Sequence, residues 1–126
     1  MLKEKIIYLD NGEEKYPLLF STNVIEILQL EFNEVDIIEK IRGNGSMPDF
    51  RVLNPFLFEL INEGIRYMNR FAEKKRKPVT KEQVGWVISE AGWNKAFETI
   101  KKAIELGMPS QSESPKNDKA TQNVNP

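Results

Sequence analysis

The spacing of the apolar residues changes after Phe20, and the change predicts two kinds of secondary structure. Up to Phe20, the apolar residues first form a short run of β-branched and aromatic residues and then occupy every second position, as in strands. Beyond Phe20 they recur at steps of three and four, as in amphipathic helices. We therefore predict an α+β fold, mostly α, in which an N-terminal β-hairpin packs on a bundle of four to five helices.

The hairpin is expected between residues 6 and 20. Residues 6–9 read as a strand, and the Asp-Asn-Gly turn that follows tolerates positive φ, so residues 14–20 form the return strand. Tyr16, Leu18 and Phe20 alternate onto one face. Pro17 cannot donate a ladder hydrogen bond, so this strand should have one open edge.

A long helix over Asn54–Lys77 is predicted to be central, with Asn54 as N-cap and Pro55 as its first residue. Alternatively, Pro48-Asp49 opens an early turn that leads into this helix, and Pro55 would kink a helix that begins at Asp49. The positions expected to face inward are Leu57, Leu60, Ile61, Gly64, Ile65, Met68, Phe71 and Ala72. Those expected on the outer face are Glu59, Asn62, Glu63, Arg66, Asn69, Arg70 and Glu73. Glycine is costly inside a helix, so Gly64 indicates that another backbone crosses closely there.

Two shorter helices should precede the central one. Ser21, Thr22 and Asn23 are possible N-caps of the first, of which Asn23 or Thr22 is expected to start a helix that runs to about Phe32. Its apolar face is wide, so it is either buried between hairpin and central helix, or Leu30 and its neighbours cover a partner. The second helix runs over Val35–Arg42 and stops at Gly43.

Two further helices should follow the central one. Thr80 and Gln83 form a capping box, and the helix that they open ends at Gly92. Trp86 lies off its inward stripe, either at the flank of the core or as an exposed contact. The last helix begins at Trp93 and is stopped by Gly107 and Pro109. Residues 1–108 are thus one hairpin-plus-helix domain, and residues 109–126 are a polar tail predicted to be disordered.

The amino-acid composition limits the kinds of catalytic or metal-binding site that the chain can form. The 126 residues are 40% hydrophobic and 29% charged, with a formal net charge of -1 and neither cysteine nor histidine. The usual general base, the commonest metal ligand and any thiolate are missing. We expect no catalytic, cofactor-binding or metal-binding residues and no enzyme. No apolar run approaches the roughly 18 residues of a membrane span, and no signal peptide is recognisable, so a cytosolic protein is expected.

Two motifs offer alternatives. The cations of Lys74–Lys77 could bind phosphate, or they could simply favour the negative end of the central helix, which is the preferred interpretation. The Ala91-Gly92 junction between two helices could be a helix-turn-helix. However, Ile88 is large for the early core position, and Glu98 occupies a later position that should be apolar. A DNA-binding regulator is therefore the runner-up.

Short motifs resemble the tail assembly chaperones of long-tailed, siphovirus-type bacteriophages. A hairpin turn and a Tyr-Pro-Leu strand, within residues 11–20, lead into an acidic-apolar helix that ends Leu30-Glu31-Phe32-Asn33. Family members often have glycine where Asn33 stands, and asparagine also adopts αL readily. Residues 80–85 resemble the start of the family's penultimate helix. The similarity covers residues 6–104.

The resemblance implies a late, non-enzymatic chaperone of viral tail morphogenesis. It would bind the tape measure protein and the major tail (tube) protein in the bacterial host cytoplasm and be absent from the mature virion. Self-association is left open. Apolar residues beyond the needs of the core are the candidate partner-binding positions: Leu30, Phe58, Tyr67 and Trp86. Because the net charge is near zero, we expect binding to weaken little with salt.

Overall fold

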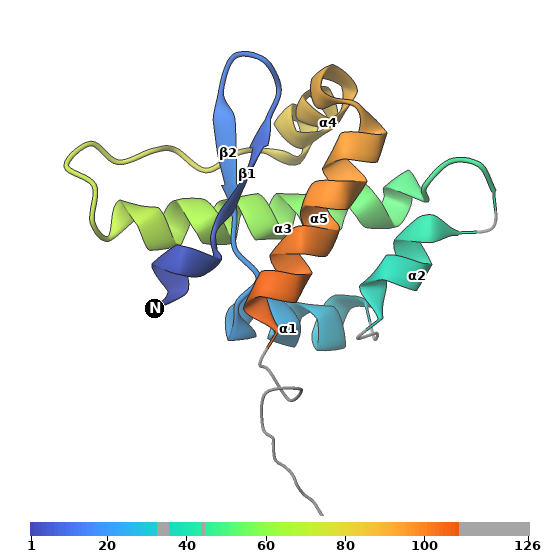
Figure 1. Cartoon of the computed structure of the whole chain (residues 1–126), viewed down its shortest axis with the longest axis horizontal. Helices are drawn as coiled ribbons and strands as arrows, with labels where there is room; N and C mark the ends of the chain where they lie inside the picture. The colour runs from blue at the N-terminus through green and yellow to red at the C-terminus, as the bar shows by residue number, and fades with distance from the viewer. Residues whose placement is uncertain (33–35, 44, 109–126) are drawn as a thin grey trace, which may run out of the picture.

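The computed structural model describes residues 1–32, 36–43 and 45–108. It confirms the predicted fold class, because this part of the chain is mostly helical and begins with an antiparallel two-stranded hairpin (Figure 1). The predicted polar tail and the predicted helix start at Val35 lie outside the described residues. Within the described ranges, no helix combines the length and apolar character needed to cross a membrane.

The elements follow in the order η1 (Leu2–Lys5), β1 (Ile7–Asp10), β2 (Lys15–Leu18), α1 (Thr22–Ile27), η2 (Leu28–Phe32), α2 (Ile37–Arg42), α3 (Phe50–Asn69), α4 (Lys81–Ala91) and α5 (Trp93–Gly107). Here η1 is a 3-10 turn and η2 is a π-helical extension of α1. In Figure 1, α3 runs behind the hairpin, α5 crosses in front of α3, and α1 lies below α3.

The hairpin forms where it was predicted. Tyr8 lies opposite Pro17 in the antiparallel register. The side chain of Asn11 closes the turn by accepting the backbone N–H groups of residues 13 and 14, and Gly12 has φ 101°. Pro17 leaves the second edge of β2 without a strand, as expected, and α3 covers that edge.

The N-cap of the first helix lies one residue before Thr22 and two residues before Asn23, the two expected caps. Ser21 is the N-cap of α1, but its hydroxyl makes no capping hydrogen bond. It donates instead to the carboxylate of Glu63 on α3, and Asn23 donates to the same group. The predicted caps were wrong because polar side chains of this turn bind the carboxylate of Glu63 on α3 rather than the first backbone N–H groups of α1. Gly43 ends α2 with φ 64°, as predicted.

The central helix is shifted toward the N-terminus of its predicted range. It starts at Phe50 because Asp49 caps it, accepting the backbone N–H of Arg51. The predicted N-cap, Asn54, lies inside the helix, where its Oδ1 is buried without a hydrogen-bond partner among the described residues. Pro55 is likewise internal, so the helix gives up one backbone hydrogen bond there.

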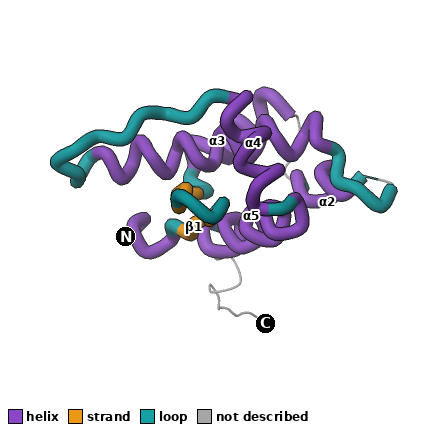
Figure 2. The backbone as a smooth tube through the Cα atoms, turned by 90° about the horizontal axis from the view of Figure 1, so that it is seen from above, coloured by secondary structure: helices purple, strands orange, loops and turns teal. Residues whose placement is uncertain are grey.

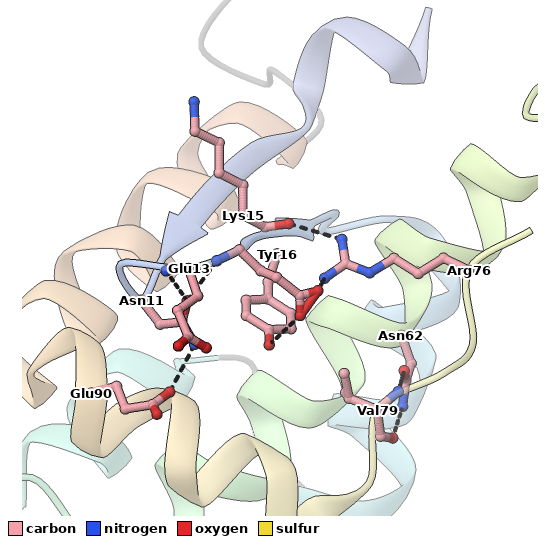
Figure 3. Close-up of polar contacts among 9 residues, drawn as sticks. Asn11, Glu13, Lys15, Tyr16, Asn62, Arg76, Val79 and Glu90 are labelled. Atoms are coloured by element: carbon pink, nitrogen blue, oxygen red, sulfur yellow. Dashed lines mark hydrogen bonds and ion pairs between the residues drawn. The ribbon is translucent and has the colours of Figure 1, made fainter.

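The helix ends at Asn69 rather than at Lys77, and the chain turns back along it. The segment 70–80 runs beside α3 to the start of α4 (Figures 1 and 2). Asn69 donates to the carbonyl of Arg76 (3.0 Å) and accepts its N–H (2.9 Å). Asn62 makes the same two bonds to Val79, at 3.0 and 2.8 Å (Figure 3).

The spacing of the two asparagines explains why this segment fits. Seven helical residues rise about 10 Å, and three residues of extended chain span about the same distance. Each asparagine amide therefore meets one backbone unit of the 70–80 segment. Periodicity assigned both asparagines to the outer face, which was wrong for Asn62 because the returning chain covers it.

Three consecutive residues of α3 are buried against three different parts of the chain. Asn62 faces Val79, Glu63 faces the start of α1, and Gly64 faces β2. A Cβ on Gly64 would lie 2.5 Å from the carbonyl oxygen of Pro17, which confirms the predicted close backbone crossing. At this level α3 is enclosed on nearly all sides.

The last two helices close the core as predicted. The Thr80–Gln83 capping box opens α4, and Gly92, with φ 96°, separates it from α5. α5 packs on β1, where Lys95 Nζ donates to the carbonyl of Asp10 (3.1 Å). The inward residues of these two helices are Val84, Val87, Ile88, Ala96, Ile100 and Ala103.

Candidate functional site

The four residues predicted to bind a partner differ in exposure. Leu30 in η2 is 76% exposed and Trp86 in α4 is 59% exposed. Phe58 and Tyr67, both on α3, are half-buried. Trp86 was predicted to be either the flank of the core or an exposed contact, and its exposure favours the exposed contact.

These residues do not share one surface. Phe58 and Tyr67 are nine positions apart, which separates them by about 13 Å along α3 and by half a turn around it. Phe58 lies near the start of α4, with Lys81 Nζ 5.5 Å from its ring centre. η2 lies near this same part of α3, where the rings of Phe32 and Phe56 meet edge to face with centres 6.1 Å apart. Burial, and then the charge of Glu31 in η2, raise the pKa of Glu59. Tyr67 belongs to a different surface, at the other end of the helix.

A polar hollow of about 420 Å³ lies beside Tyr67, between α3 and the start of α1. The wall residues supplied by α3 and its C-cap are Glu63, Arg66, Tyr67 and Arg70, and those from the N-terminal part of the chain are Leu2, Ser21, Thr22 and Asn23. Cationic, hydroxyl and amide groups therefore surround a space large enough for a side chain of a partner.

Glu63 forms the fixed negative part of this hollow. The residue is only 5% exposed, and its carboxylate accepts hydrogen bonds from Ser21 and Asn23 and pairs with Arg66 at 2.9 Å. Burial opposes the charged form, but these three partners outweigh it, so the pKa of Glu63 lies below its ordinary value. The carboxylate is ionised at neutral pH and its acceptor capacity serves the fold.

An apolar hollow of about 220 Å³ lies on the other side of Tyr67, which lines both spaces. Its other walls are Lys3, Met68, Phe71 and Ala72. The rings of Tyr67 and Phe71 meet edge to face with centres 5.4 Å apart. Tyr8 donates to the sulfur of Met68 (3.3 Å), which joins the hairpin to this surface.

Two cations lie over these aromatic rings. The Arg70 guanidinium is 5.4 Å from the ring centres of both Tyr67 and Phe71, and Lys3 Nζ is 5.3 Å from that of Phe71. Within the described part of the chain, Arg70 forms no ion pair with a carboxylate. We call the whole region the α3-end surface, which comprises Leu2, Lys3, Tyr8, Arg66, Tyr67, Met68, Arg70 and Phe71.

The chemistry of the α3-end surface is that of binding. Arginine side chains can donate hydrogen bonds to carboxylates, and the rings and methionine of this surface offer apolar contact. The described residues hold no group of three or more histidine, cysteine, aspartate or glutamate side chains placed to bind a metal ion. The absence of catalytic and cofactor residues stays a prediction.

The basic cluster at residues 74–77 is partly used by the fold. Lys75 Nζ donates to the backbone carbonyl of Asn69, so this cation does satisfy the end of α3 although the helix stops earlier than predicted. Arg76 donates to a backbone carbonyl of β2 and lies 4.7 Å from the ring centre of Tyr16 (Figure 3). Two of the four cations therefore hold the 70–80 segment in place.

The helix-turn-helix interpretation gains little from the geometry. α5 would be the recognition helix, yet it packs on β1. Lys95 is bound to the carbonyl of Asp10, and Lys101 lies 3.8 Å from Glu98. Mixed charge on this helix does not make the cationic surface that a DNA backbone requires.

Sequence reasoning missed most of the α3-end surface because it extended α3 too far. Phe71 was expected to face inward, which was wrong: it follows the helix and is 52% exposed. The available signal was the alternation of cationic and aromatic residues between Arg66 and Phe71. Such a run at a helix end points to a surface where arginines stack on rings.

No protein-family model matches the chain, and no curated protein or solved structure matches it.

Proposed function

We propose that this chain is a non-enzymatic tail assembly chaperone of a long-tailed bacteriophage, which binds the tape measure protein during tail morphogenesis. The short motifs in residues 11–33 and 80–85 support the family. The observation that carries the binding role is the exposure of large apolar side chains on a domain whose own core is complete. Leu30, Trp86 and Phe71 are all more than half exposed while the core residues beneath them are buried.

The physical requirement of the role fits such a surface. A tape measure protein is a long helical chain whose apolar seams are exposed until the tail tube surrounds them. Covering those seams takes apolar contact that tolerates sequence variation, and aromatic and long aliphatic side chains supply it. Binding of the tail tube protein, and action in the host cytoplasm, are further parts of the proposal.

Co-expression with the tape measure protein of the same phage tests the role. The expected result is a soluble complex that co-purifies, and a tape measure protein that aggregates when this chain is omitted. An unrelated aggregation-prone helical protein is the control, and it should stay insoluble. If the tape measure protein is no more soluble and no complex forms, the chaperone function is wrong. Tight, salt-sensitive binding to duplex DNA would instead support the regulator.

A further inference from the structure

We propose that the α3-end surface is the site that receives the partner, and that it takes a helical segment in which a large apolar residue lies beside an acidic one. The proposal rests on the proposed function for the identity of the partner, the tape measure protein. It adds which surface binds and what sequence chemistry is recognised.

The two hollows of this surface require two kinds of side chain. The 220 Å³ hollow is walled by Tyr67, Met68 and Phe71, which suit a leucine or phenylalanine side chain. The 420 Å³ hollow presents Arg66 and Arg70. Because Tyr67 lines both, the two bound side chains must come from neighbouring positions of one segment, such as i and i+3 or i+4 of a helix.

Charge complementarity assigns the acidic partner. The residues that line the two hollows include three cations, Lys3, Arg66 and Arg70, and one carboxylate, that of Glu63, although the whole chain has a net charge of -1. Glu63 already accepts hydrogen bonds from two neighbours and pairs with Arg66. This leaves Lys3, beside the apolar hollow, and Arg70, which lines the polar hollow and is therefore the cation placed to meet a carboxylate of the partner. The contact of Arg70 with two rings holds its guanidinium in place.

The decisive variant is Arg70→Glu, and Lys102→Glu is its control. Both replace an exposed cation by an acid, but Lys102 lies on the outer face of α5. In pull-down with the tape measure protein, Arg70→Glu should weaken binding by about tenfold or more, because a buried charge contact becomes a repulsion, while Lys102→Glu should bind as the unmodified chain does. Tyr67→Ala should also weaken binding, and Arg70→Lys should restore part of it.

Two helical peptides test recognition by the α3-end surface independently of the tape measure protein. Both carry the same Leu/Phe seam, flanked by glutamates in one and by lysines in the other. The glutamate peptide should bind the chain, lose affinity as salt rises, and lose it again with Arg70→Glu; the lysine peptide should not bind. This salt dependence departs from the expectation based on net charge, because the local charge of the surface is positive.

The outcomes distinguish two failures. If the tape measure protein binds equally to all variants, the proposed function holds and the assigned surface is wrong. If the glutamate peptide binds through Arg70 but the tape measure protein does not, the recognition chemistry stands and the proposed partner is wrong. Equal binding of the two peptides would overturn the acidic preference. Self-association that disappears with Arg70→Glu would show that a second copy occupies the surface.

Discussion

The middle of α3 and its C-terminal end, less than two turns apart, have opposite surroundings. Residues 62–65 are buried and contact the hairpin, the start of α1 and the 70–80 segment. Residues 66–71 are half-buried or exposed and carry two arginines and two aromatic rings. One helix therefore contributes its middle to the core and its C-terminal end to the exposed α3-end surface.

The two asparagines make this comparison quantitative, because each forms the same pair of hydrogen bonds to the 70–80 segment in a different environment. Asn62 is 5% exposed, whereas Asn69 is half-buried. A hydrogen-bonding group that loses its partner costs more where water cannot replace it. Substitutions in the middle of α3 should thus change stability strongly, and those at its end should change binding instead.

The largest effect is expected for Gly64→Ala. The new Cβ would lie 2.5 Å from the backbone oxygen of Pro17, and backbone atoms cannot move aside cheaply, so the free energy of unfolding should fall by about 3 kcal/mol. Gly64→Leu should cost more. Denaturant unfolding measures the change.

Gly85→Ala is the matched control, since Gly85 is also inside a helix but its nearest neighbour would be 3.9 Å from the new Cβ. There alanine should raise stability by about 0.5–1 kcal/mol through helix propensity. If the two substitutions had the same effect, α3 would not be tightly crossed at Gly64.

The next effect compares Asn62→Ala with Asn69→Ala. The first leaves the N–H and carbonyl of Val79 unpaired in the interior and should cost about 2 kcal/mol, and the second should cost about 0.5–1 kcal/mol because water reaches Arg76. The midpoint temperatures of thermal unfolding of the two variants show which substitution costs more stability. Equal losses would contradict the difference in burial.

A smaller, pH-dependent effect is expected for Glu63→Gln, at about 1–2 kcal/mol near neutral pH. The pKa of Glu63 is lowered in the folded chain, so its contribution is fully present above the ordinary value of 4.5 and is lost as the pH falls through the lowered pKa. Unfolding curves of the unmodified chain and the variant should therefore converge in acid. A constant difference at all pH values would show that the charge of Glu63 is not what stabilises the contact.

The smallest effect on stability is expected for Tyr67→Ala, about 1 kcal/mol or less, because this side chain is only half-buried. Its effect on partner binding should exceed its effect on unfolding. A loss of stability as large as that of Gly64→Ala would place Tyr67 in the core and remove it from the binding surface.

The elements and their faces were largely predictable from periodicity and turn chemistry. The hairpin turn, the Gly43 and Gly92 stops and the Thr80 capping box depend on residues close in the chain. The start of α3 at Asp49 was only an alternative to Asn54, because both residues can cap a helix, and its far end was not predictable because the returning chain sets it. Burial of Asn62 and Glu63 depends on segments distant in sequence, and the shape of the α3-end surface follows from the same contacts.

The enclosure of α3 has a consequence for the order in which the chain can fold. The contact between Ser21 and Glu63 joins residues 42 positions apart, that between Arg76 and Lys15 joins residues 61 apart, and that between Lys95 and Asp10 joins residues 85 apart. During synthesis the hairpin emerges first, yet a lone two-stranded hairpin is only marginally stable in water. It gains its cover from α3 and then α5, so the hairpin reaches its stable packed form only after these later segments have been synthesised.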